Sequence, residues 1–259
     1  MNAPAQWHDL APRVLSGVAM AVGGAALVWT GGWMFTVAVC VLAGLMIWEC
    51  TGLFDVEGRA SLPILGTAAL FGALHLPGMI VLPLLLAVAF VAAGQSGRDK
   101  GLYALCVLWV LLGCYMMVVL REQAGLIWVI WLVLVVVVSD VAGYFAGRML
   151  GGPKFWPRIS PKKTWSGTVA GWVGAAIIGA VFAVPTGAGL MLVPISVLVG
   201  FAGQMGDIAE SAVKRRVGAK DSSSLIPGHG GVLDRFDAML GAGLLVMGLW
   251  VLKLLPGLA

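Results

Sequence analysis

The segment LIWVIWLVLVVVVSDVAGYFAG, residues 126–147, opens with thirteen consecutive apolar residues and carries one charged side chain, Asp140. An α-helix needs about 20 apolar residues to cross a hydrocarbon core about 30 Å thick. A run of this length and hydrophobicity is typical of a transmembrane helix rather than of a helix buried in a soluble core. This segment therefore predicts an integral membrane protein.

The rest of the chain extends the same pattern. Of its 259 residues, 60% are hydrophobic and 11% are charged, whereas soluble domains are about 45–50% apolar and about 25% charged. This composition excludes an ordinary soluble domain and a disordered chain. Eight further apolar segments are present, at 14–30, 33–50, 62–76, 78–94, 102–120, 168–184, 190–206 and 238–255.

We therefore predict an all-α, polytopic membrane bundle of about nine transmembrane helices. Residues 1–125 would supply the N-terminal helices and residues 126–259 the C-terminal helices of a single membrane domain. The third segment ends at Leu76 and the fourth begins at Gly78, so only Pro77 separates them. These two segments could instead form a re-entrant pair or one long kinked helix.

The basic residues predict how the chain is oriented. With the N-terminus inside and nine alternating spans, fourteen of the sixteen Lys and Arg residues fall on the inner side, and only Arg121 and Lys253 fall outside. Cytoplasmic loops are enriched in Lys and Arg, so this distribution predicts a cytoplasmic N-terminus. The fourteen are Arg13, Arg59, Arg98, Lys100, Arg148, Lys154, Arg158, Lys162, Lys163, Lys214, Arg215, Arg216, Lys220 and Arg235.

Two polar loops, roughly 148–167 and 207–237, hold ten of these fourteen cations. Half of the twelve carboxylates accompany them, and a basic loop needs no carboxylates to set topology. Both loops are therefore candidates for a functional site at the cytoplasmic face. The six acids are Asp140, Asp207, Glu210, Asp221, Asp234 and Asp237.

The second polar loop begins with GDIAESAVKRR, residues 206–216, which continues an apolar span without a proline. We expect the helix to extend into the cytoplasm, with Asp207, Ser211 and Lys214 on one face. A carboxylate, a hydroxyl and an ammonium together suit a metal-bound phosphate. The alternative is an ordinary charged helix end in which Glu210 and Lys214 form an ion pair.

The stretch KDSSSLIPGHGGVLDRFD, residues 220–237, is punctuated by Pro and Gly. Such a loop lets the backbone approach a ligand, and its N–H groups can contact phosphate oxygens. Asp234 and Asp237 fall in the first turn of the next helix. They either satisfy the helix N-terminus or bind Mg²⁺ together with substrate phosphates. His229 is a candidate for proton transfer, phosphate contact or ordering of the loop.

The first polar loop adds an acid near membrane depth, Asp140, and the run Ser160–Trp165, SPKKTW. Intramembrane acids are energetically costly and are functional candidates. Two lysines and two hydroxyls next to a tryptophan suit an anionic lipid phosphate, and a simple headgroup anchor is the alternative.

The stretch SAVKRRVGAKDSSSLIPGHGGVLDRFD, residues 211–237, resembles the signature of the phosphatidate cytidylyltransferase family, also called CDP-diacylglycerol synthases. The upstream stretches SD…YFAGR and ISPKKTW, within residues 139–167, resemble the family's second motif. Two departures are present. Ser166 stands where the family usually has Glu, and Ser222–Ser223 replace a more usual aromatic–Gly pair.

The resemblance implies an enzyme that joins CTP to phosphatidic acid, giving CDP-diacylglycerol and pyrophosphate. From the residues themselves we predict Mg²⁺ held by Asp207 and Asp234, because a helical hairpin through the glycine loop can bring these two helix ends together, with membrane lipid around the protein. The resemblance implies a second and monovalent cation such as K⁺, and a homodimer. We expect no nucleic-acid partner, because the excess positive charge is that of cytoplasmic loops. We expect the bacterial inner (cell) membrane, with the active site facing the cytoplasm.

The site residues divide by expected role. The catalytic candidates are Asp140, Lys214, Arg215, Asp234 and Asp237. The substrate-binding candidates are Arg148, Ser160, Lys162, Lys163, Thr164, Ser211, Lys220, Asp221, His229, Gly230, Gly231 and Arg235.

The sequence leaves two rival functions open. One is a CTP-dependent transferase acting on another lipid, such as an archaeal ether lipid or a polyprenol. The other is an ion-coupled transporter, a class in which intramembrane acids and glycine-rich spans also occur.

Overall fold

The structure is a computed structural model that describes residues 10–58 and 60–258, with side chains from residue 14 onward. Arg59 and the segment 1–9 lie outside the described residues, as does the side chain of Arg13. The predicted inner location of the N-terminus and of these two arginines therefore stays a prediction.

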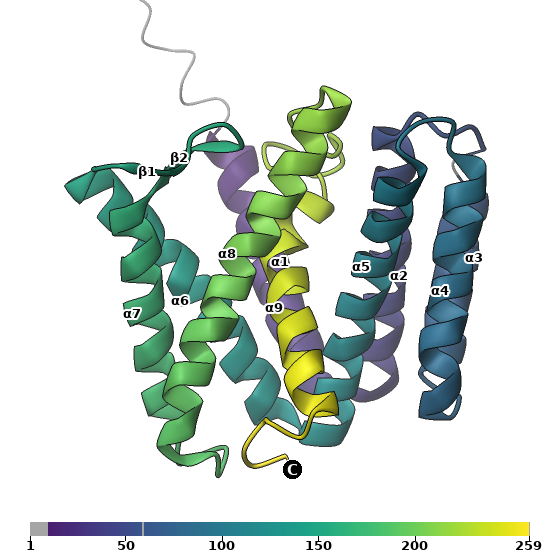
Figure 1. Cartoon of the computed structure of the whole chain (residues 1–259). Helices are drawn as coiled ribbons and strands as arrows, with labels where there is room; N and C mark the ends of the chain where they lie inside the picture. The colour runs from purple at the N-terminus through teal and green to yellow at the C-terminus, as the bar shows by residue number, and fades with distance from the viewer. Residues whose placement is uncertain (1–9, 59, 259) are drawn as a thin grey trace, which may run out of the picture. The chain divides into compact units, whose positions relative to one another are not determined.

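The described part of the chain folds into nine α-helices (Figure 1). A π-helical turn, Leu120–Ala124, precedes α6, and a short 3₁₀ turn, Gly189–Met191, precedes α8. The helices are α1 (Leu10–Thr30), α2 (Gly32–Leu53), α3 (Ser61–Ala73), α4 (Gly78–Gln95), α5 (Lys100–Val119), α6 (Leu126–Leu150), α7 (Trp165–Phe182), α8 (Leu192–Val217) and α9 (Leu233–Val251).

These helices confirm the membrane bundle but not nine complete spans. Six segments of the described chain are long and apolar enough to cross a membrane, namely α2, α4, α5 with its π-helical turn, α6, α7, and α8 with its 3₁₀ turn. By contrast, α3 has 13 residues, which at 1.5 Å per residue extend about 20 Å, short of a hydrocarbon core of about 30 Å. The third and fourth predicted segments form two separate helices, so the single kinked helix is wrong.

A small β-hairpin follows α6, and the sequence analysis did not predict it. Strand β1 (Lys154–Trp156) pairs antiparallel with β2 (Ser160–Thr164), with Lys154 opposite Thr164 and Trp156 opposite Ser160. The hairpin leads directly into α7, whose N-terminus is capped by the Thr164 hydroxyl accepting from the Gly167 N–H at 3.2 Å. The register of the hairpin shifts between its two residue pairs, and Lys162 and Lys163 lie opposite that irregularity.

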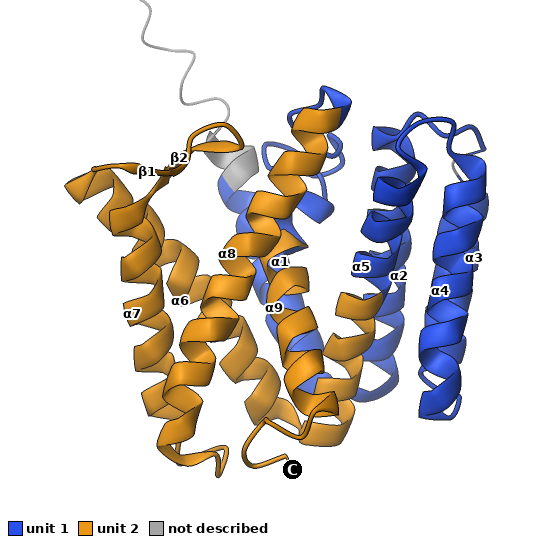
Figure 2. Ribbon diagram, viewed as in Figure 1, with its two compact units in different colours: residues 1–111, 217–236 blue, residues 112–216, 237–259 orange. Residues whose placement is uncertain are grey.

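The chain forms two compact units, coloured separately in Figure 2. The first contains the described residues up to Leu111 together with 217–236, and the second contains 112–216 and 237–258. The boundary falls within α5, and the glycine-rich segment of the second polar loop groups with the first unit. The sequence-based description of residues 1–125 and 126–259 as two sets of helices in a single membrane domain stays a prediction.

Close helix packing in the second unit depends on glycine. A Cβ atom on Gly167 of α7 would lie 2.5 Å from the carbonyl oxygen of Gly143 in α6. On the other side of the unit, a Cβ on Gly241 of α9 would lie 2.5 Å from the carbonyl oxygen of Ala202 in α8. Small residues allow such close approach between membrane helices, and here they bring α6, α7, α8 and α9 into contact.

Candidate active site

A cavity of about 440 Å³ opens in the second unit, lined by residues of α6, β2, α7 and α8. The lining contains six residues that the sequence singled out, and they come from both polar loops. These six are Asp140, Arg148, Lys162, Lys163, Thr164 and Asp207. The prediction that the first loop and the start of the second contribute to one place is consistent with this cavity.

Lys163 is held in the cavity by two contacts. Its ammonium lies 2.6 Å from Oδ2 of Asp207 and donates to the carbonyl oxygen of Gln204 at 3.1 Å. Arg148 is oriented by Tyr144, whose hydroxyl accepts from the guanidinium at 2.8 Å. Because these cationic side chains are already held in place, they lose little conformational entropy when they bind phosphate oxygens.

Gln204 is a buried polar residue that the sequence analysis missed. Its amide nitrogen donates to the Ser139 hydroxyl and to the Thr168 carbonyl oxygen, each at 3.3 Å, and its amide oxygen accepts from the Trp172 indole at 3.2 Å. The missing side chain at Gly171 leaves room for this amide. A glutamine in the apolar segment 190–206 was the available signal, because a buried amide needs polar partners.

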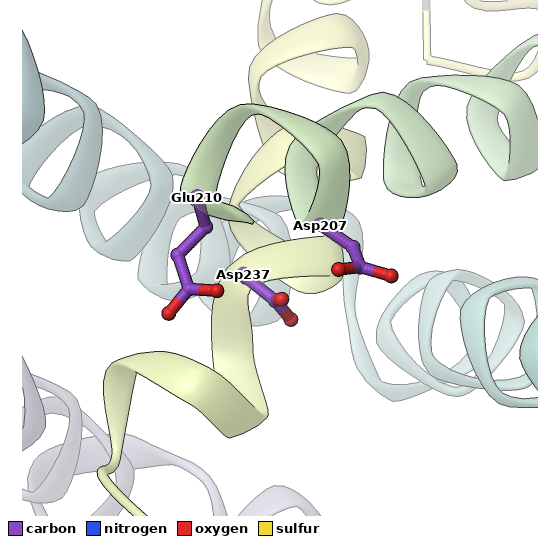
Figure 3. A group of neighbouring side chains, drawn as sticks. All are labelled: Asp207, Glu210 and Asp237. Carbon is purple, nitrogen blue, oxygen red and sulfur yellow. The ribbon is translucent and has the colours of Figure 1, made fainter. Parts of the chain in front are cut away.

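Three carboxylates of the second unit form an acidic group, shown in Figure 3. Asp207 and Glu210 extend from α8, and Asp237 from the first turns of α9; one ligand oxygen of each lies within 4.8 Å of those of the others. Asp237 precedes the apolar part of α9. Its pKa is raised to about 7, first by burial and then by the nearby Asp207 carboxylate.

The acidic group fits a divalent cation. Hard cations such as Mg²⁺ take carboxylate oxygens, and a positive ion would offset the mutual repulsion that raises the Asp237 pKa. The group contains Asp207 as predicted, together with Asp237, which was predicted as catalytic, and Glu210, for which an ion pair was the alternative. That pair is present, with Lys214 Nζ 2.5 Å from Glu210 Oε2.

Ser211 and Lys214 take different partners on α8. The Ser211 hydroxyl donates to Asp207 at 3.4 Å, whereas Lys214 turns to Glu210. The predicted face of carboxylate and hydroxyl is therefore formed, while the lysine next to it contacts another acid. Arg215, one turn from Ser211, is exposed.

In the first unit, Asp234 is the centre of the glycine-rich loop. Its Oδ2 accepts from the Gly231 N–H at 2.7 Å and from the Ser222 N–H and hydroxyl at 3.0 Å each. These donors lie ahead of α9, so Asp234 orders the loop before the helix, whereas the capping role that the sequence left open needs an N–H of the helix's first turn. The predicted Mg²⁺ pair of Asp207 and Asp234 stays a prediction.

His229 is fixed within the same loop. Its Nδ1 lies 2.9 Å from the Ser16 hydroxyl of α1, and its carbonyl oxygen accepts from Arg235 Nε at 2.9 Å. Gly230, at φ +84°, adopts a backbone conformation that suits glycine. These contacts describe an ordered loop in which Arg235 supports the backbone of His229.

The remaining predicted residues are spread along the two loops. Ser160 is half-buried in β2 outside the cavity lining, and Lys220 is exposed. Asp221 is exposed beside a second cavity, of about 630 Å³, which lies within the first unit next to Ser222 and Ser223. The structure therefore groups some predicted residues in the second unit and others around the loop of the first.

Comparison with known proteins identifies relatives over nearly the whole chain. The model of the cytidylyltransferase family matches residues 11–252. A phosphatidate cytidylyltransferase of Brucella suis is 35% identical over 254 residues, which cover 92% of each chain. One from Bacillus subtilis is 30% identical, covering 90% of this chain and 94% of its own. One from Helicobacter pylori is 43% identical over 121 residues, 46% of this chain and 45% of its own.

Proposed function

Because the chain belongs to the cytidylyltransferase family, we propose that it joins CTP to phosphatidic acid in the membrane, giving CDP-diacylglycerol and pyrophosphate. The observation that carries the proposal is the family match over residues 11–252. The cavity of the second unit supports it, because cations and carboxylates there are set among apolar helices.

The reaction transfers a cytidylyl group between two phosphates. A phosphate oxygen of phosphatidic acid forms a bond to the α-phosphorus of CTP, and the bond from that phosphorus to the bridging oxygen of the β-phosphate breaks. Pyrophosphate leaves with the electron pair. The attacking phosphate is already ionised near neutral pH, so the protein needs to align the reactants and neutralise charge rather than remove a proton.

The residues of the first polar loop are proposed to bind substrate phosphate. Lys163, oriented by Asp207, and Arg148, oriented by Tyr144, present cationic donors at the cavity. Ordered donors directed at developing negative charge stabilise a transition state more than mobile ones. Lys220 and His229 of the glycine-rich loop are proposed to contact phosphate oxygens through their side chains.

Asp207, with Glu210 and Asp237 beside it, is proposed to hold Mg²⁺, and Asp234 is proposed as a further ligand as predicted from the sequence. Mg²⁺ bound there would neutralise charge on the phosphates of CTP. A second, monovalent cation such as K⁺ and a homodimer are further proposals that rest on the family resemblance.

The proposed location is the bacterial inner membrane, with the polar loops in the cytoplasm. CTP is a water-soluble nucleotide and phosphatidic acid lies in the bilayer, so the reaction requires a polar site at a membrane face. Within the second unit, the β1–β2 hairpin and the C-terminal end of α8 lie at the same end (Figure 1). The positive charge of both loops favours the cytoplasmic face.

The decisive experiment incubates purified protein in detergent with labelled CTP, phosphatidic acid and Mg²⁺. We expect a labelled CDP-lipid on thin-layer chromatography, together with stoichiometric pyrophosphate. Parallel reactions with an ether-linked lipid phosphate and with a polyprenyl phosphate test the rival acceptors. Absence of any CDP-lipid across several detergents and salts would contradict the proposal and favour the transporter.

A further inference from the structure

Glu49 is a buried carboxylate near the C-terminal end of the second apolar segment, 33–50, and no sequence motif assigns it a role. It lies on α2 with 1% of its surface exposed. Burial of an ionised carboxylate is costly unless the group is well hydrogen-bonded. Its surroundings in the first unit therefore decide what this residue does.

The glycine-rich loop surrounds the Glu49 carboxylate with four hydrogen-bond donors. Oε1 accepts from the Ser223 hydroxyl at 2.6 Å and from the Val232 N–H at 2.8 Å. Oε2 accepts from the Leu233 N–H at 2.7 Å and from the Ser222 hydroxyl at 3.4 Å. The residues that donate are 173 to 184 positions away along the chain.

These contacts occupy most of the acceptor capacity of the side chain. An ionised carboxylate has about four lone-pair sites; three donors here belong to Glu49 alone, and the single proton of the Ser222 hydroxyl is shared with Asp234. Two of the donors belong to residues 232 and 233, at the N-terminus of α9, where N–H groups lack partners within the helix and the helix dipole favours negative charge. Glu49 is therefore built to hold a backbone conformation rather than to bind a metal or accept a proton.

Glu49 and Asp234 act on the same segment from two sides. Asp234 binds the Gly231 N–H while Glu49 binds those of Val232 and Leu233, and the Ser222 hydroxyl contacts both carboxylates. Both ends of the loop, residues 222–223 and 231–233, are consequently fastened to a single point on α2.

The same arrangement explains why residue 231 is a glycine. A Cβ atom on this residue would overlap the Ser222 hydroxyl and lie 2.5 Å from Glu49 Oε1. It also gives a physical reason for Ser222 and Ser223, which depart from the aromatic–Gly pair usual in the family: both hydroxyls donate to Glu49.

We infer that Glu49 is a positioning residue, which holds the glycine-rich loop in the conformation that presents Lys220 and His229 to substrate phosphate. Its role in the reaction rests on the proposed function, whereas its effect on the loop is independent of any activity. A loop fastened in this way binds phosphate without the ordering cost of a mobile one.

The test compares Glu49→Gln with Ser223→Ala and with the control Glu57→Gln, which changes an exposed acid between α2 and α3. In Glu49→Gln the charge is lost, and the amide NH₂ group faces a donor. Hydrogen exchange of the detergent-solubilised protein, followed by mass spectrometry, should show about 10- to 100-fold faster exchange in peptides covering 221–236. Ser223→Ala should change the same peptides by a smaller factor, and Glu57→Gln should match the wild type.

The enzyme assay supplies the second readout. Glu49→Gln should raise the KM of CTP or of phosphatidic acid by about 10-fold or more while the thermal unfolding of the helices is retained, because a mobile loop must be ordered on binding. Faster exchange at 221–236 with unchanged KM and kcat would overturn the positioning role. Unchanged exchange at 231–233 would overturn the inference altogether.

If Glu49→Gln does not fold, Ser223→Ala is the deciding variant, because it removes only one of the four hydrogen bonds to the Glu49 carboxylate. Faster local exchange and a raised KM in that variant support the inference, and wild-type values for both overturn it. If the wild-type protein forms no CDP-lipid, the proposed function fails, while the exchange data still decide whether Glu49 holds the loop.

Discussion

The ammonium nitrogen of Lys163 in β2 lies 2.6 Å from Oδ2 of Asp207 in α8, so this ion pair joins the two polar loops within the second unit. Both side chains are partly exposed, at 22% and 35%. The pair therefore remains accessible to a substrate from the cavity. Its contribution is expected in substrate binding more than in stability, because exposed ion pairs stabilise a fold weakly.

Replacing Lys163 by Ala should lower kcat/KM about 10- to 100-fold with little effect on folding, because a charge-assisted contact to phosphate is lost. Lys163→Arg should restore only part of the activity, since a planar guanidinium presents its donors differently. The measurement is steady-state kinetics against both substrates. Lys154→Ala, a change at an exposed lysine of β1, is the matched control. Wild-type kinetics in Lys163→Ala would show that this lysine only sets the membrane topology and does not bind substrate.

Replacing Gly206 by Ala should disturb the acidic group through the backbone. A Cβ at this position of α8 would overlap the carbonyl oxygen of Asp237, so α8 and α9 would have to move apart. Overpacking of this kind costs about 1–3 kcal/mol. We expect a lower thermal midpoint in detergent and a clear loss of activity. Gly248→Ala on α9 is the control, because its Cβ would meet no atom within 4 Å. Equal thermal midpoints and activities of the two variants would contradict the close packing of α8 against α9 at Gly206.

The helices could be predicted from the sequence because each one depends on local hydrophobicity. The helix that extends past residue 206 was predicted correctly and ends at Val217, since no proline or glycine interrupts it before Gly218. The hairpin at 154–164 was missed because its strands have three and five residues, too few to show an alternating pattern. The third predicted segment, 62–76, is already short, and α3 ends three residues earlier, at Ala73, because hydropathy does not show where a helix ends.

The sequence predicts many of the residues that form the site, but not which of them contact one another. Asp207 and Lys163 were identified because charged residues are rare in this chain and their loops are dense in them. Glu49 was missed because all four of its partners are more than 170 residues away, and no local pattern records such contacts. Glu210 was assigned to Lys214 by its spacing, which is correct, but its approach to Asp237 depends on how α8 packs against α9.

The proposed orientation can be tested by cysteine labelling in a background from which Cys40, Cys50, Cys106 and Cys114 have been removed. R158C lies between β1 and β2, and V184C lies at the other end of α7, where the native side chain is 87% exposed. An impermeant maleimide should label V184C on intact spheroplasts. R158C should react only after permeabilisation. The reverse pattern would contradict a cytoplasmic location of the polar loops.

Asp234→Asn tests whether Asp234 is a metal ligand, as the sequence predicts, in addition to a residue that orders the glycine-rich loop through its contacts. An asparagine oxygen can still accept from the Gly231 N–H, so this contact is kept while the charge is lost. As a ligand, Asp234 should behave like Asp207 and Asp237. Each Asn variant should then lose at least about 10²-fold in kcat and need more Mg²⁺. The double Asp207/Asp234 variant should be little worse than either single one, because ligands of one ion act as a unit. Near-wild-type turnover and Mg²⁺ dependence in Asp234→Asn, next to a strong loss in Asp237→Asn, would show that the acidic group alone binds the metal and that Asp234 only orders the loop.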